Sequence, residues 1–199
     1  MLPQTLHNNR QIEKLGNGLI FLCNNLEKAS KTHLLKLVYI IEEISIKKFG
    51  IPFFNLDFYL WHLGPVNQDL YVQLSESTTI LEPYITTEPS ADGKSVIVKA
   101  KREFSDAEFS DNEIALLESI IDRFKHCTAK ELINHTHKKD SLWYNTAVKN
   151  GLWEVLESGQ KTTTEIQLDL SELIRDNPNK LNFYNSHKEF LKQSKALKS

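Results

Sequence analysis

The sequence has little of what stabilises secreted proteins and nothing that resembles a membrane anchor. Its two cysteines, Cys23 and Cys127, are too few and too far apart to form a disulfide framework. The N-terminal segment lacks the charged and apolar regions of a secretory signal. The longest apolar stretch, residues 34–41, is interrupted by Lys36 and is far too short to span a membrane. We therefore expect a cytoplasmic protein with free thiols and no membrane partner.

The sequence also lacks an excess of either charge. The formal net charge is -2 and the isoelectric point is about 6.4, so there is no general attraction for phosphate of the kind that nucleic-acid binders show. Hydrophobic residues make up 40% and charged residues 25% of the 199 positions, which is typical of a single globular domain. The common catalytic and phosphate-binding motifs are missing, and we expect no cofactor and no enzymatic activity.

What is present is mainly helical patterning. Apolar residues recur at helical spacing over residues 9–28 and again over residues 31–49, where Gly50 offers a C-terminal stop. The second segment has the wider apolar face, and the acidic residues Glu42 and Glu43 are assigned to water. We expect it to be the central buried helix of a mainly α domain with a small β-hairpin, an α+β fold.

The middle of the chain has a different sequence pattern, with short elements in place of long amphipathic helices. Asn55 is placed to cap a short aromatic helix over residues 55–61, and a second short helix is expected over residues 66–75. Residues 79–102 contain two segments rich in β-branched residues, with Asp92-Gly93 between them. Because Asp-Gly favours tight turns between strands, this segment predicts a β-hairpin.

The second half is again helical. Two sequences with the spacing of a capping box, Ser110 to Glu113 and Thr128 to Glu131, predict helix starts before residues 114–125 and 132–137. A turn or helix is expected over residues 141–150. A last amphipathic helix is expected over residues 181–191.

Three local patterns in fixed order resemble the Panacea domain, also called the SocA-like antitoxin domain, of bacteria and phages. The first is the leucine-rich Leu34 to Tyr39, with its Lys-Leu-Val-Tyr core. The second is Trp61-His-Leu-Gly-Pro-Val66, similar to the family's Trp-x-x-Gly-Pro-Val signature. The third is Leu132 to His137 followed by Trp143. The resemblance predicts a Panacea-like domain over residues 1–155, with residues 156–199 as a C-terminal helical extension packed on it.

The resemblance implies the function of an antitoxin. Members are typically encoded beside an unrelated toxin that they neutralise, and at least one relative is an adaptor that delivers its toxin to a protease. The expected partners are thus a cognate protein toxin, a protease and, because many antitoxins repress their own operon, operator DNA. A DNA-binding regulator is the alternative function, motivated by the consecutive capped helices after Ser110 and Thr128.

The residues that carry the resemblance are also the expected partner-binding residues. These are Tyr39, Trp61, His62, Gly64, Pro65, Val66, His137 and Trp143. Aromatic side chains anchor protein interfaces because they bury a large area at a low cost in entropy. The alternatives are structural: core packing for Trp61, a tight helix-ending turn for Gly64 and Pro65, and a buried hydrogen bond for His137.

Catalytic and metal sites are less well supported. A site drawing on Cys23, His126, Cys127 and His137 would have none of the close-pair spacings of zinc ligands, so no metal is expected. A nucleophilic pair of Cys127 and His137 lacks any visible oxyanion hole or orienting acid. A hydrolase or nuclease that uses His137 remains the weakest hypothesis.

Overall fold

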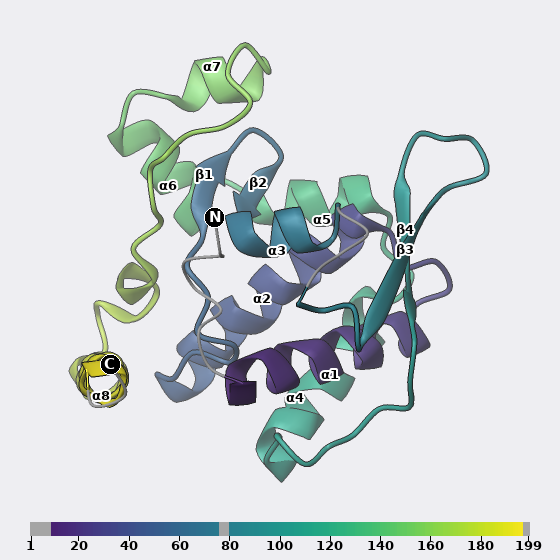
Figure 1. The fold of residues 1–199 in the computed structure, drawn as a ribbon. Coiled ribbons are helices and arrows are strands. Elements are labelled where there is room, and N and C mark those ends of the chain that lie inside the picture. The colour runs from purple at the N-terminus through teal and green to yellow at the C-terminus, as the bar shows by residue number, and fades with distance from the viewer. Residues whose placement is uncertain (1–8, 76–79, 197–199) are drawn as a thin grey trace.

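A computed structural model describes residues 9–75 and 80–196 of the chain. The elements are, in order, α1 (Asn9–Asn25), α2 (Lys31–Phe49), β1 (Tyr59–Trp61), β2 (Gly64–Val66), α3 (Gln68–Gln73), β3 (Ile85–Pro89), β4 (Val96–Ala100), α4 (Asp111–Phe124), α5 (Ala129–Thr136), α6 (Leu142–Lys149), α7 (Trp153–Glu157), the 3-10 helix η1 (Leu170–Ile174) and α8 (Pro178–Ala196). The expected fold class, mainly helical with small antiparallel hairpins, is confirmed (Figure 1).

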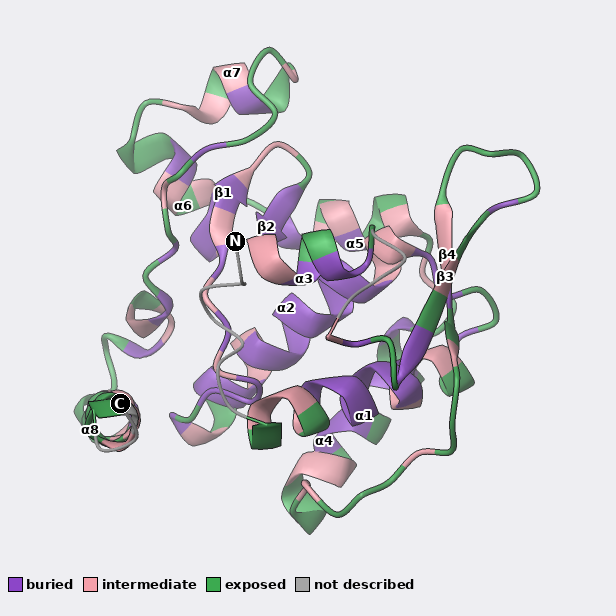
Figure 2. Ribbon diagram, in the orientation of Figure 1, coloured by how far each residue is buried: buried purple, intermediate pink, exposed green. Residues whose placement is uncertain are grey.

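Helix α2 runs through the middle of the molecule, with α1, α3, α4 and α5 around it (Figure 1). Ser30 caps its first turn by accepting a hydrogen bond from the N–H of His33, and Gly50, at φ 72°, ends it. Most of its length is buried (Figure 2). The expected central helix over residues 31–49 is therefore confirmed, and the rest of the fold is positioned on it.

Two charged side chains of α2 are fully buried. Lys36 is 1% exposed and Glu42 is 0% exposed. The carboxylate of Glu42 accepts hydrogen bonds from the N–H groups of Phe53 (3.0 Å), Phe54 (2.7 Å) and Leu56 (3.1 Å). The prediction that Glu42 faces water is wrong, because the loop after α2 folds back and supplies the donors that a buried carboxylate requires.

The predicted helix over residues 55–61 is also wrong. Asn55 takes a left-handed conformation, φ 57°, that cannot serve as a helix N-cap, and residues 59–61 form strand β1. The strand pairs with β2 on one side, where Trp61 lies opposite Gly64. On its other side the N–H of Leu60 donates to the carbonyl of Ile166 and that of His62 to Thr162. Partners on both edges thus override the short-range helical signals.

The predicted β-hairpin within residues 79–102 is confirmed. Strands β3 and β4 pair antiparallel, and the turn between them is closed by a hydrogen bond from the N–H of Gly93 to the carbonyl of Ser90. Ile80 and Leu81 form a turn before β3, and residue 79 lies outside the described residues. The hairpin projects from the helical body (Figure 1). On the other edge of β4, the N–H of Val98 donates to the carbonyl of Ala29.

Helices α4, α5, α6 and α8 follow the predicted pattern with shifted ends, whereas α7 and η1 were not predicted. Both capping boxes are formed, at Ser110 with Glu113 and at Thr128 with Glu131. Helix α3 is shorter than the expected 66–75, because Val66 belongs to β2, and α8 is longer than the expected 181–191. Within the described residues, none of the helices combines the length and apolar character needed to cross a membrane.

Candidate partner-binding site

The site is built on the tight hairpin of β1 and β2, which packs on α2 and α5. Lys36 Nζ donates a 2.9 Å hydrogen bond to the carbonyl of Pro65, which ties β2 to α2. Gly64 has φ 99°, and a Cβ added there would lie 2.6 Å from Thr136 Oγ1 and 3.1 Å from Lys36 Nζ. Only glycine fits this position, since both the backbone conformation and the close neighbours exclude a side chain.

Two aromatic rings support the hairpin from the side of α5 and α6. The imidazole of His137 stacks on the indole of Trp143, with ring centroids 3.7 Å apart and planes at 3°. Trp143 Nε1 donates to the carbonyl of Trp61 at 2.8 Å. His137 Nε2 is buried and has no hydrogen-bond partner among the described residues. The stack therefore fixes the outer end of β1 while leaving one polar atom unpaired next to Gly64.

Residues after the predicted domain boundary complete the site. Trp61 Nε1 donates to the carbonyl of Thr164 at 3.2 Å, and Thr164 Oγ1 donates to the carbonyl of Leu60 at 2.7 Å. The Nδ1 of His62 donates to the carbonyl of Leu156. Nothing in the sequence near Thr164 signals this role, since the pairing is made across about a hundred residues and needs no motif.

Burial sets the charge of the two ionisable groups at the centre. Desolvation lowers the pKa of Lys36 to about 7, and it lowers that of His137 to about 4, with further lowering from the charges of Lys36 and His62. His137 is therefore neutral at physiological pH. A neutral imidazole stacked flat on Trp143 serves packing, but the buried hydrogen bond expected for His137 is not found at its buried Nε2 among the described residues.

The arrangement gives no support to a catalytic or metal site. No group of three or more His, Cys, Asp or Glu side chains among the described residues is arranged to hold a metal ion. The carbonyl of Cys127 accepts a hydrogen bond from His33 Nε2, and no hydrogen bond joins Cys127 to His137 in the described part of the chain. Burial raises the pKa of the Cys23 thiol to about 12, which keeps it from acting as a nucleophile.

The eight predicted residues divide into a buried group and a half-buried group. Those with little or no exposure are Tyr39, Gly64, Pro65, Val66 and Trp143, and those half-buried at the surface are Trp61, His62 and His137. Tyr39 packs edge to face on Phe58, with ring centroids 5.1 Å apart, inside the core. The buried group shapes the hairpin, and only the half-buried group is placed to contact a partner.

Sequence reasoning missed three further residues of this surface. Leu63, at the tip of the hairpin, is 47% exposed, and Tyr71 on α3 is 39% exposed. Tyr59 lies two residues before Trp61 and is half-buried. The signal that could have found it is the alternation of β1, where Phe58 and Leu60 are buried while Tyr59 and Trp61 are not.

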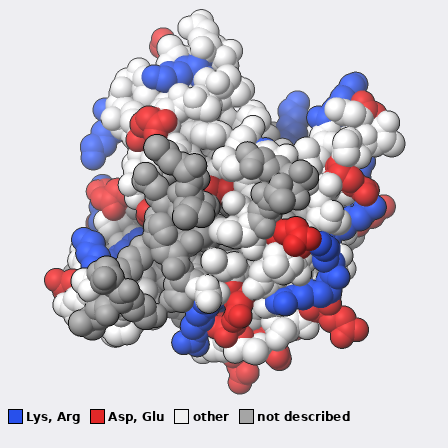
Figure 3. Space-filling view, viewed as in Figure 1, with Lys and Arg blue, Asp and Glu red and all other residues white. Residues whose placement is uncertain are grey.

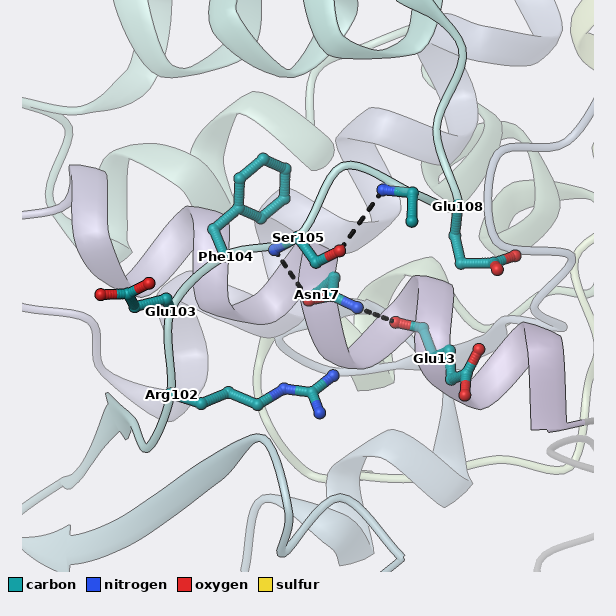
Figure 4. A pocket seen from close by; sticks show the side chains of 8 residues that line it. Glu13, Asn17, Arg102, Glu103, Phe104, Ser105 and Glu108 are labelled. Carbon is teal, nitrogen blue, oxygen red and sulfur yellow. Dashed lines mark hydrogen bonds between the residues drawn. The ribbon is translucent and has the colours of Figure 1, made fainter.

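A hollow lies elsewhere in the described part of the chain, between α1 and the segment that joins β4 to α4. It has a volume of about 610 Å³, and Figure 4 shows Arg102 and Glu103 on one side of it and Glu13 and Asn17 on α1. Asn17 links the two sides by accepting from the N–H of Ser105 at 3.2 Å. None of the predicted site residues lines this hollow.

A comparison of the sequence with known families identifies a described domain. The family model of the SocA-like antitoxin, Panacea domain, matches residues 34–144, more than half of the 199-residue chain. The chain belongs to this family. The matched region contains all of α2 after its first three residues, the β1–β2 hairpin, α5 and Trp143, so the Panacea domain supplies all eight predicted residues. No curated protein and no solved structure matches the chain.

Proposed function

We propose that this Panacea domain protein is an antitoxin that binds a cognate protein toxin and neutralises it. The observation that carries the proposal is the family match over residues 34–144. The exposure of the signature hairpin supports the proposal, since Trp61 and His62 are half-buried and Leu63 is exposed on a backbone that is hydrogen-bonded along both edges of β1. A rigid hairpin loses little conformational entropy when it binds a partner.

Co-expression with the products of the neighbouring open reading frames tests the proposal. We expect one neighbour to arrest growth when expressed alone and to be harmless together with this chain, with which it should co-purify as a complex. The control is the same toxin co-expressed with an unrelated helical protein of similar size. If no neighbouring product is rescued or forms a complex, the antitoxin proposal fails.

Stoichiometry separates binding from catalysis. An antitoxin that acts by binding neutralises a fixed number of toxin molecules, so residual toxin activity should fall linearly with added chain and then stop changing. Neutralisation by far fewer chains than toxin molecules would instead support an enzyme. The proposal of a non-enzymatic function rests on the family.

Protease delivery and operator binding are separate parts of the proposal. Delivery predicts that the toxin is degraded faster when this chain and the protease are both present than with either alone. Operator binding predicts a salt-sensitive gel shift with the upstream promoter. Figure 3 shows acidic and basic side chains interspersed over the visible face rather than a continuous basic field, which favours protein over DNA as the main partner.

The division of the chain at residue 155 also remains a proposal. The hydrogen bonds from Leu60 and His62 to Ile166 and Thr162 support an extension that is packed on the Panacea domain. Limited proteolysis tests this point, because a packed extension should resist cleavage between residues 156 and 168.

A further inference from the structure

Three aromatic side chains form a surface where β1 and α3 lie side by side. Tyr59 and Trp61 both lie on the outward face of β1, two residues apart, while Leu60 between them is buried. The ring of Trp61 meets that of Tyr71 on α3 edge to face, with centroids 5.1 Å apart. We call Tyr59, Trp61 and Tyr71 the aromatic surface. All three rings remain at least partly accessible to a partner.

The protein itself shows that a ring of this surface binds a cation. The ammonium of Lys31 lies 3.2 Å from the ring centroid of Tyr71, and it also contacts Ser75. Tyr59 and Trp61 have no cation over their rings among the described residues. Tyrosine and tryptophan faces attract ammonium and guanidinium groups through the ring quadrupole.

Carboxylates gather at the Tyr59 end of this surface. Burial raises the pKa of Tyr59, and the nearby charges of Asp57, Glu165 and Asp69 raise it further. Lys188 lies 3.7 Å from Asp57 and compensates that charge in part. Glu165 is exposed, and among the described residues its hydrogen-bond partner is the neutral amide of Gln68, at 3.4 Å. The local field at Tyr59 is therefore negative.

We propose that the aromatic surface, with Glu165 and its neighbouring carboxylates, binds a basic segment of the toxin. An arginine or lysine side chain there would place its charge over the rings of Tyr59 or Trp61 and against Glu165, so that one group satisfies both features. Phosphate groups and acidic segments are repelled by the same carboxylates, and a purely apolar segment would bury Glu165 without a counter-charge. This inference rests on the proposed antitoxin function and assigns the chemistry of the partner.

Charge reversal at Glu165 tests the inference. The probe is the purified product of the neighbouring open reading frame that the wild-type chain neutralises, titrated by calorimetry at low and high salt. We expect Glu165→Lys to weaken binding about tenfold or more at low salt and less at high salt, because exposed charge pairs are screened. Tyr59→Ala should weaken binding about tenfold at both salt concentrations, because it removes ring contacts.

The matched control is Glu118→Lys, the same charge reversal on an exposed position of α4. It should leave the Kd within about twofold, and thermal melting should show that all variants fold. Unchanged binding by both Glu165→Lys and Tyr59→Ala, with a wild-type complex intact, overturns the inference and leaves the antitoxin proposal standing. If the wild-type chain binds none of the neighbouring products, the antitoxin proposal fails first and this inference fails with it.

Discussion

Glu42 and Lys36 are both buried charges of α2, yet their surroundings differ. Glu42 has three backbone donors on its two oxygens, from Phe53, Phe54 and Leu56. Lys36 has three N–H groups but only the carbonyl of Pro65 as an acceptor among the described residues. The unpaired Nε2 of His137 and the ammonium of Lys36 both lie beside Gly64. Glu42, whose hydrogen bonds are satisfied, ties the following loop to α2. Lys36, whose hydrogen bonds are only partly satisfied, ties the hairpin of the proposed binding site to the same helix.

Removing the carboxylate of Glu42 should have the largest effect on stability. Glu42→Ala leaves three N–H groups without an acceptor in the core, and we expect a loss of about 3–5 kcal/mol in the free energy of unfolding. Urea denaturation followed by circular dichroism measures this loss.

Two variants serve as controls for that measurement. Glu42→Gln keeps one acceptor oxygen and should lose less, while Glu118→Ala on exposed α4 should change the free energy by no more than about 0.5 kcal/mol. If Glu42→Ala loses no more than Glu118→Ala, then the two ends of α2 do not differ in the way described.

Gly64→Ala should have the next largest effect, and it acts at the Lys36 end. A side chain at φ 99° is strained, and its Cβ would lie 2.6 Å from Thr136 Oγ1, so we expect a loss of about 2–4 kcal/mol. Gly93→Ala is the matched control, because Gly93 also has positive φ, 68°, but nothing lies within 4 Å of an added Cβ. A loss at Gly64 no larger than that at Gly93 would show that the hairpin is not tightly seated.

Lys36→Met should have the smallest effect at pH 7 and a distinct pH dependence. The variant loses the hydrogen bond to Pro65 but removes a costly buried amine, and we expect these to offset each other to within about 2 kcal/mol. The folded pKa of Lys36 is about 7, below the ordinary value of 10.5. Between these values the unfolded chain binds more protons, so the contribution of Lys36 to stability rises with pH.

The measurement is the difference in melting temperature between Lys36→Met and wild type from pH 7 to pH 9.5. The melting temperature of wild type should rise relative to that of the variant as the pH rises, because the variant lacks the amine whose contribution to stability increases with pH. Taking the difference between the two proteins cancels the titration of other groups. Lys139→Met, at an exposed lysine, should run parallel to wild type. A Lys36→Met curve that is also parallel would contradict the lowered pKa.

Local signals predicted the parts of the fold whose partners are close in sequence. The helix starts at Ser110 and Thr128 follow from side chains that bond within three residues, and the turn at Asp92-Gly93 follows from its own conformational preference. The central helix followed from apolar periodicity over residues 31–49. The residues that specify each of these elements lie within the element itself or next to it in the sequence.

The errors arose where the determinants are distant. The prediction for Glu42 fails because its donors lie in a loop whose path the sequence does not show. The predicted helix over residues 55–61 fails because the strand partners of this segment, Thr162 and Ile166, are about a hundred residues away in the sequence. The candidate site was partly predictable from its signature. Its division into the buried Tyr39 and Trp143 and the half-buried Trp61 required coordinates.

The pairing of β1 with residues 162–168 bears on how this domain can be transplanted. The family match stops at residue 144, yet the backbone N–H groups of Leu60 and His62 find their acceptors beyond it. A fusion protein that is cut at the family boundary would leave those donors without their acceptors and the indole of Trp61 without Thr164. The portable unit, for grafting onto another protein or for swapping between relatives, therefore extends at least to Leu168, whose own N–H closes the ladder on Phe58.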